Sequence, residues 1–391
     1  MYKHRNVISA IILTFFLTSL FYLTAGSNVL SFIGSFTGDS FSKMKRVERL
    51  IDKYYIDDYD KDKMQDAALE SYVASLGDKY SDYISKEEFD SYQTMVTGDY
   101  EGIGVEVYID DDNLITVDSV YENSPAAKSG IMVGDKLINA DGVDISYDNY
   151  SEALKIIKGV KSKSDTVKII VQRNGEKIEI NVKREKISLN YVKSEKIDDL
   201  YYIALSSFEG KSAAQFQKAL DETKKSGSKG LIIDLRNNPG GTLETVLDIA
   251  DDILDKGVIL TIKSKNGSEK VYKADDEKSF NIPICILVNS NTASAAEVLT
   301  AALSDNKKAT VVGTKTYGKG VVQSIFMLGD NSALKITASK YYTPNNICIN
   351  KIGITPDIVV EQNDEYKNSP VSSIPHEDDT QLKKAIEVLS K

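Results

Sequence analysis

Residues 201–304 alternate short apolar runs with segments of helical spacing, and no other feature of the chain constrains its fold more. Runs that are apolar throughout, rather than at every second residue, are typical of strands covered on both faces. The pattern therefore predicts an α/β domain in which a sheet lies between layers of helices. The expected strands are 201–206, 230–234 and 284–288, and the expected helices are 213–225, 243–254 and 295–304.

A β-rich domain is expected over 99–184, where short strand-like runs are separated by turn residues and one helical segment, 147–157. Its expected strands are 102–108, 113–120, 136–139, 166–173 and 177–183. The sequences EGIGV at 101–105, SPAAKSG at 124–130 and GD at 134–135 together resemble a PDZ domain. The glycines could also serve ordinary tight turns, which would be compatible with the same fold.

A PDZ-like domain would bind an extended peptide along one strand edge and hold its terminal carboxylate on backbone N–H groups. The peptide-binding residues expected from this resemblance are Gly102, Ile103, Gly104 and Val105.

The first 26 residues predict membrane attachment. Residues 7–25 contain no charge and are preceded by Lys3 and Arg5, and 19 helical residues can just cross a bilayer. The positive flank predicts that the rest of the chain lies outside the cytoplasm. A cleaved signal peptide is the alternative, although its apolar region is usually shorter.

Two outer regions flank the domains. Residues 27–98 read as helical, with an apolar stripe that includes Met44, Val47 and Leu50, and 361–391 read as a linker followed by a short helix. These stripes fit either packing on the chain's own body or a homodimer.

Composition excludes several kinds of chemistry. The chain has only two histidines, His4 and His376, and only two cysteines, Cys285 and Cys348, so no metal site built on several of them is expected. A Ser-His-Asp triad would have to take its base from a terminal segment. The net charge of −10 opposes nucleic-acid binding. We expect no cofactor, and the cysteines read as buried free thiols.

Three segments carry candidate chemistry, each with an ordinary structural reading beside it. Ser294 and Glu297 form a capping-box pattern at a strand-to-helix junction, where a serine can either cap the helix or act as a nucleophile. GTKTYGKG at 313–320 lacks the hydroxyl of a phosphate loop because Gly320 replaces it, which leaves Lys319 between two glycines. DLRNNPGG at 234–241 follows a predicted strand, where ligand sites of α/β sheets lie, or forms a plain turn.

These segments, together with LGDKYSDY at 76–83, YYTP at 341–344 and GITPD at 353–357, resemble the carboxy-terminal processing (tail-specific) proteases in order from about 41 to 360. The resemblance implies a crotonase-like or ClpP-like protease core over 185–360. It also implies Ser294 as nucleophile, Lys319 as general base and Gln323 as the residue that orients the lysine. The sequence departs from the family at Ala296, where a second serine is common, and at 345–351.

A serine–lysine dyad needs a neutral lysine, and burial lowers the pKa of an amine. We expect an oxyanion hole made by backbone N–H groups of Gly240 or Gly241 and of Ala295. The expected function is a membrane-anchored, extracytoplasmic serine endopeptidase that cleaves proteins at or near their C-terminal tails, which its PDZ domain selects. A catalytically inactive, membrane-anchored PDZ adaptor is the alternative.

Overall fold

The computed structural model describes residues 40–391 except residues 98, 111, 148, 160–163, 276–279 and 367–370. The expected membrane anchor at 7–25 lies outside the described residues. Within the part that is described, no helix is both long and apolar enough to span a membrane.

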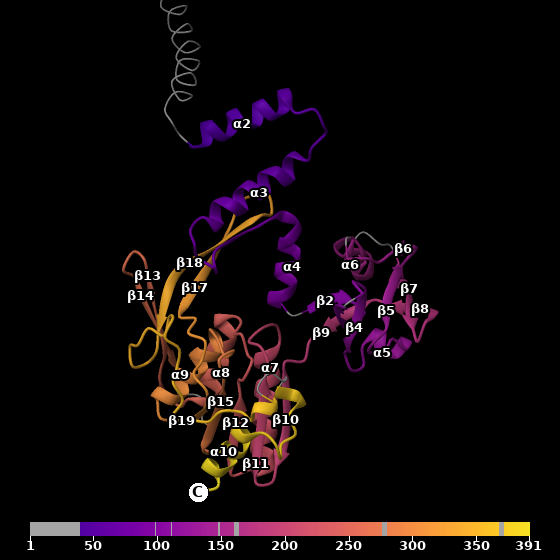
Figure 1. Ribbon diagram of the computed structural model, residues 1–391. Coiled ribbons are helices and arrows are strands. Elements are labelled where there is room, and N and C mark those ends of the chain that lie inside the picture. The colour runs from indigo at the N-terminus through magenta and orange to yellow at the C-terminus, as the bar shows by residue number, and fades with distance from the viewer. Residues whose placement is uncertain are drawn as a thin grey trace, which may run out of the picture. The chain divides into compact units, whose positions relative to one another are not determined.

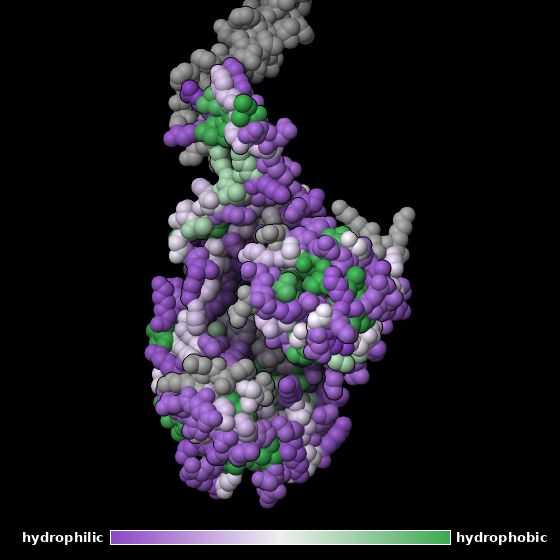
Figure 2. All heavy atoms as spheres, turned by 45° about the vertical axis from the view of Figure 1, so that its right-hand side comes forward, coloured by the Kyte–Doolittle hydropathy of each residue, from purple (hydrophilic) through white to green (hydrophobic). Residues whose placement is uncertain are grey.

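The chain divides into two compact units, Met1–Ala68 and Leu69–Lys391. The described part of the first unit contains α2 (Ser40–Tyr54) and the beginning of α3 (Lys61–Ala74). Glu48 on α2 pairs with Lys61 at 2.9 Å, and accepts a hydrogen bond from Gln65 at 3.0 Å. The apolar stripe of α2 is exposed rather than buried, and Figure 2 shows hydrophobic atoms on the surface of this unit.

The β-rich domain is a single antiparallel sheet with strand order β3-β4-β5-β7-β8, and β6 pairs with β5. Its strands are β3 (Val105–Ile109), β4 (Ile115–Val120), β5 (Lys136–Ala140), β6 (Val143–Asp144), β7 (Thr166–Arg173) and β8 (Glu176–Lys183), and its helices are α5 (Pro125–Ser129) and α6 (Tyr150–Lys158). The inward residues of the sheet and helices form one apolar core. A further antiparallel pair, β2 (Asp99–Gly102) and β9 (Glu185–Ser188), stands at the start and end of the domain.

Two of the three motifs of this domain, SPAAKSG at 124–130 and GD at 134–135, stabilise its turns. The Ser124 side chain accepts a hydrogen bond from the N–H of Ala127 and so caps α5, which begins at a proline and ends at Gly130 with a left-handed backbone. Asp135 is fully buried and receives Arg173 at 2.6 Å and the N–H of Met132 at 2.9 Å. The motif residues therefore fix the turns that shape the domain.

The larger domain is built on a six-stranded sheet with order β10-β11-β12-β15-β16-β19, in which all neighbours are parallel except β10 and β11. Its strands are β10 (Val192–Ile197), β11 (Leu200–Leu205), β12 (Gly230–Asp234), β15 (Ile284–Val288), β16 (Ala309–Gly313) and β19 (Ile358–Val359). Its helices are α7 (Ser212–Ser226), α8 (Leu243–Ile253), α9 (Ala295–Asp305) and α10 (Thr380–Leu389).

Alternate residues of the central strands serve two different cores. Ile233 and Ile286 belong to the core that includes residues of α7, α8 and α9, whereas Ile232 and Cys285 belong to the core that includes residues of α10. These helices are labelled in Figure 1. The two cores confirm the expected sheet between layers of helices. The helix α10 buries Leu382 and Ala385 on its own sheet, so the C-terminal apolar stripe packs on its own domain.

A second sheet, which the sequence did not predict as a unit, has order β1-β18-β13-β14, with β17 also paired to β18. It consists of β1 (Asp82–Ile84), β13 (Gly257–Ser264), β14 (Glu269–Ala274), β17 (Val321–Met327) and β18 (Ala333–Tyr342). The helix α4 (Lys86–Thr97) follows β1, and two short 3₁₀ turns, η1 (Asp364–Tyr366) and η2 (Val371–Ser373), precede α10. Through β1, the segment that follows α3 is paired to the same sheet as β17.

Candidate functional site

Ser294 lies at the sharp junction between β15 and α9. It has φ +55° and ψ −118°, a conformation that costs energy for a residue other than glycine. Gly240 packs directly against it, because a Cβ at Gly240 would stand 2.8 Å from the Cβ of Ser294 and 2.9 Å from the nitrogen of Ala295. The structure thus brings together the two segments from which the sequence predicts a nucleophile and an oxyanion hole.

Glu297 joins the Ser294 segment to the Lys319 segment. Its side chain is completely buried and accepts four hydrogen bonds. One carboxylate oxygen receives the N–H groups of Ser294 at 2.9 Å and Lys319 at 2.8 Å. The other receives the hydroxyl of Thr316 at 2.6 Å and the N–H of Gly318 at 2.8 Å. The carboxylate of the predicted capping box therefore also anchors the loop that carries Lys319.

Tyr341 on β18 makes a second bridge between the same two residues. Its hydroxyl contacts the carbonyl oxygen of Ser294 at 3.1 Å and that of Lys319. The side chain is buried, and burial raises the pKa of its phenol well above the usual value, so it stays a neutral donor. The main chains of Ser294 and Lys319 are thus held through both their N–H and their C=O groups.

The amine of Lys319 is in the partly desolvated setting that a neutral lysine needs. Burial lowers the pKa of Lys319 below its ordinary value, and the positive charge of Lys335 lowers it further. The ammonium nitrogen lies 4.9 Å from the centre of the Tyr80 ring. Tyr80 and Tyr341 were not singled out from the sequence, because they lie in segments far from Lys319 along the chain.

Gln323, the residue expected to orient Lys319, stands on β17. Its amide nitrogen donates to the hydroxyl of Thr337 on β18 at 3.1 Å. Among the hydrogen bonds of the described residues, none joins Gln323 to the amine of Lys319. The amide is thus directed by the neighbouring strand, and its action on the lysine stays a prediction.

In the glycine loop after β12, the two backbone N–H groups of Gly240 and Gly241 differ in their hydrogen bonding. The N–H of Gly240 donates to the side chain of Asn238 at 2.8 Å, and Asn238 itself is fully buried and donates to the carbonyl of Leu205. In the described part of the chain, the N–H groups of Gly241 and Ala295 donate to no other protein group. Gly241 and Ala295 are therefore better placed than Gly240 to supply free donors.

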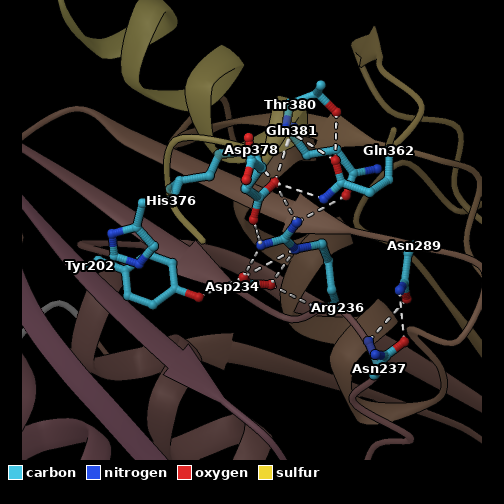
Figure 3. A network of polar contacts seen from close by, with 12 residues as sticks. Tyr202, Asp234, Arg236, Asn237, Asn289, Gln362, His376, Asp378, Thr380 and Gln381 are labelled. Carbon is cyan, nitrogen blue, oxygen red and sulfur yellow. Dashed lines mark hydrogen bonds and ion pairs between the residues drawn. The ribbon is translucent and has the colours of Figure 1, made fainter. Parts of the chain in front are cut away.

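A buried ion-pair network, drawn in Figure 3, lies directly before this loop. Arg236 donates to Asp234 at 2.6 Å and to Asp379 at 2.8 Å, and all three side chains are almost fully buried. Tyr202 donates to Asp234 at 2.7 Å. Although burial opposes it, the guanidinium of Arg236 holds the pKa of Asp379 below its usual range. No motif in the sequence indicated that Asp379 pairs with Arg236, because the two residues are 143 positions apart.

The same loop is also tied to the segment that leads to Ser294. Asn289 donates to the side chain of Asn237 at 2.7 Å, and its own oxygen accepts from the N–H of Asn237 at 3.0 Å (Figure 3). Asn237 has φ +60°, a conformation that asparagine tolerates better than most residues. These contacts fix the loop that carries Gly240 and Gly241 relative to the end of β15.

An apolar groove of about 240 Å³ lies between β3 and α6 of the β-rich domain. Ile103, Val105 and Val107 line it beside Leu154 and Ile157 from the helix. The expected single strand 102–108 is wrong: Ile103 and Gly104 form a loop between β2 and β3. Gly104 has φ +82°, and a Cβ there would lie 2.4 Å from the Cβ of Ser124, so this loop requires a glycine.

Three of the four peptide-binding residues expected from the sequence, Gly102, Ile103 and Val105, line this groove, and Gly104 lies in the loop next to Ile103. Gly102 and Val105 end β2 and begin β3, respectively, and both line the groove. In the described residues, the N–H groups of Ile103 and Gly104 donate to no other backbone group. Such N–H groups beside an apolar groove are suited to a peptide carboxylate.

Within the described ranges, no group of three or more His, Cys, Asp or Glu residues could hold a metal ion. Cys285 and Cys348 are both free thiols, and burial raises the pKa of Cys285 to about 12.

Comparison with known proteins matches both domains. The model of peptidase family S41 matches residues 199–360, and the PDZ domain model matches residues 102–183. The chain is 35% identical over 350 residues to "Carboxy-terminal processing protease CtpA" of Bacillus subtilis (strain 168), which covers 88% of this chain and 74% of that protein. It is 33% identical over 359 residues to "Probable CtpA-like serine protease" of Staphylococcus aureus (strain COL), covering 91% and 71% of the two chains.

A solved structure agrees at the level of the fold. The "Putative S41 protease" of Bacteroides fragilis NCTC 9343 is 17% identical and superposes with a TM-score of 0.54, covering 86% of this chain and 92% of that one. Both domains match family models, and relatives at least 33% identical align with most of this chain and with more than two thirds of their own length, so the chain belongs to peptidase family S41 and is a serine-type C-terminal processing peptidase with a PDZ domain.

Proposed function

We propose that this peptidase cleaves its substrates with Ser294 as nucleophile and Lys319 as general base. The observation that carries the proposal is the pair of bridges from Glu297 and Tyr341, which hold the two residues' main chains together. Rigid placement of a hydroxyl beside a base is what nucleophilic catalysis requires. The lowered pKa of Lys319 supports its role as a proton acceptor.

The reaction proceeds in two halves. The oxygen of Ser294 attacks the scissile carbonyl while its proton passes to the amine of Lys319, and the negative oxygen is received by the N–H groups of Gly241 and Ala295. The peptide C–N bond then breaks as Lys319 gives the proton to the leaving amine, which leaves an acyl-enzyme. Water attacks the ester, Lys319 accepts a proton from it and returns it to Ser294, and the new carboxyl group departs.

The PDZ groove supplies substrate selection. An extended C-terminal tail would pair with β3, place apolar side chains between Val105 and Leu154, and bind its carboxylate at the N–H groups of Ile103 and Gly104. The substrates are accordingly proteins with apolar C-terminal tails, and cleavage occurs at or near those tails. This choice is in keeping with the name of the Bacillus subtilis relative, a carboxy-terminal processing protease.

Location and assembly belong to the same proposal. The uncharged segment 7–25 with its basic flank would anchor the chain in the cell membrane, with the peptidase outside the cytoplasm. The exposed stripe of α2, which includes Met44, Val47 and Leu50, would pair with a second copy of the chain. Detection of the protein in the membrane or the soluble fraction of cells tests the anchor. Its molar mass, measured by light scattering, tests the dimer.

The decisive experiment concerns Ser294. In a Ser294→Ala variant we expect no cleavage of a tail-bearing protein and no labelling by a fluorophosphonate, with the thermal unfolding temperature close to that of the wild type. Substitution of the exposed Ser290 by alanine is the matched control and keeps both activities. Cleavage that persists in Ser294→Ala would refute the dyad. A wild-type protein that binds tails but is neither labelled nor active would instead be a PDZ adaptor.

A further inference from the structure

A second lysine lies on the same aromatic ring as the general base. The Nζ of Lys79 is 5.0 Å from the centre of the Tyr80 ring, and the Nζ of Lys319 is 4.9 Å from the same point. The two amines are therefore no more than about 10 Å apart. Lys79 also donates a hydrogen bond to the hydroxyl of Tyr317 and lies 4.6 Å from the centre of that ring.

Hydrogen bonds within the segment and to β18 hold the Lys79 segment in place. Asp78 accepts hydrogen bonds from the hydroxyl of Ser81 at 2.6 Å and from the N–H of Tyr80 at 3.2 Å. Ser81 in turn accepts from the N–H of Thr337 on β18 at 3.0 Å. The next residues form β1, which pairs with β18. The segment that carries Tyr80 is therefore attached to β18, the strand that pairs with β17.

The charged and titratable groups that face Lys319 are few and come from four elements. Lys335 on β18 and Lys79 are positive, and both disfavour a second positive charge on Lys319. Glu297 on α9 and Tyr317 raise the pKa of Lys319 and so favour its charged form. The carboxylate of Glu297 is already occupied by four donors, and Tyr80 presents its ring.

We propose that Lys79 is a positioning residue of the general base: its ammonium, fixed by Tyr317 and Tyr80, keeps a positive charge beside Lys319 and so favours the neutral, proton-accepting amine. This inference rests on the proposed Ser294–Lys319 dyad. It assigns a role to a residue whose contacts are with Tyr317 and Tyr80. Its signature is a change in the pH dependence of the reaction rather than a uniform loss of rate.

The test compares Lys79→Met, Lys79→Arg and Lys315→Met in the full chain. Lys315 is an exposed lysine on the same loop as Lys319, so its replacement removes an equal charge without the contacts of Lys79. Fluorophosphonate labelling of Ser294 and kcat/KM for a peptide are measured from about pH 6 to about pH 10. Thermal unfolding is followed for every variant.

For Lys79→Met we expect the apparent pKa of the rising limb to move up by about half a unit to one unit. Rates well below that pKa then fall by about three- to tenfold, while rates above it approach the wild type. Lys79→Arg should restore the wild-type profile, and Lys315→Met should keep it. Because Lys79 is exposed, added salt should reduce the difference.

An unchanged profile for Lys79→Met, or a loss of rate that is equal at every pH, would overturn the inference. Ser294→Ala separates this failure from failure of the dyad itself. If Ser294→Ala is inactive and Lys79→Met behaves as wild type, the dyad stands and only the role of Lys79 is lost. If Ser294→Ala still cleaves, the dyad and the role of Lys79 are both refuted.

Discussion

At the residue scale, the carboxylate of Glu297 is the group whose loss should be felt most widely. Both its oxygens accept two hydrogen bonds, and three of the four donors are backbone N–H groups that cannot turn away. A glutamine would place an NH₂ group where one oxygen stands. At least one buried N–H would then face another donor and lose its partner.

We therefore predict that Glu297→Gln lowers kcat/KM by about a hundredfold, because Ser294 and Lys319 shift relative to each other. The free energy of unfolding should fall by about 1–3 kcal/mol, the usual cost of a buried polar group without a partner. Peptide kinetics and urea denaturation measure the two effects. Glu244→Gln, an exposed carboxylate in the first turn of α8, is the control and should match the wild type. Full activity in Glu297→Gln would show that the bridge is dispensable.

Site residues whose partners are distant in sequence could not be predicted from the sequence alone. Ser294 and Lys319 lie in recognisable local motifs, and the resemblance to the carboxy-terminal processing proteases, rather than the local pattern alone, selected them as nucleophile and base. The contacts of Tyr341, Lys79 and Asp379 could not be predicted, since their partners lie 22, 238 and 143 residues away. Local spacing carries information about one helix or strand, whereas these contacts arise from packing between distant segments.

At the scale of elements, α10 is held to the larger domain by its N-cap, Asp379, the residue just before the helix. Asp379 caps the helix by accepting the N–H groups of Gln381 at 3.1 Å and Leu382 at 3.0 Å. The same carboxylate receives both terminal nitrogens of Arg236, at 2.9 and 2.8 Å. One buried charge thus joins the C-terminal helix to the strand end from which the glycine loop begins.

Asp379→Asn should weaken this attachment, since Arg236 keeps only Asp234 as a charged partner. We expect the free energy of unfolding at pH 7 to fall by about 1–3 kcal/mol. The pKa of Asp379 is lower in the folded protein than in the unfolded chain, so its stabilisation is complete above about pH 4. It is lost as the pH falls through the folded pKa, where the variant and the wild type should converge. Urea denaturation at several pH values measures this, with the exposed Glu377→Gln as control.

Elements were predictable to the extent that their burial is continuous. The strands β12 and β15 match the expected ranges because every residue in them is buried. The strand β7 also matches, because it pairs on both sides. By contrast, β13, β17 and β18 mix buried and exposed residues without strict alternation, and such a pattern predicts a strand less clearly. Their sheet is defined by pairing between segments that are distant in sequence.

At the scale of the whole molecule, the chain combines a peptidase domain with a PDZ domain whose apolar groove we propose to bind C-terminal tails. If the groove selects substrates, disrupting it should affect tail-bearing proteins more than short peptides. Leu154 lines the groove from α6, and a glutamate there would bring an uncompensated charge into the apolar site. Val133 is an exposed residue of the same domain outside the groove, so Val133→Glu is the matched control.

We predict that Leu154→Glu lowers kcat/KM for a protein with an apolar C-terminal tail by about tenfold or more, chiefly through KM. The same substrate with an amidated C-terminus should lose a comparable amount with the wild-type enzyme, because its carboxylate can no longer bind the N–H groups of Ile103 and Gly104. The two changes act on one interaction, so combining them should cost less than the sum of their separate effects. Equal kcat/KM for the free and amidated tails, or independent effects of the two changes, would mean that the groove does not read the terminal carboxylate.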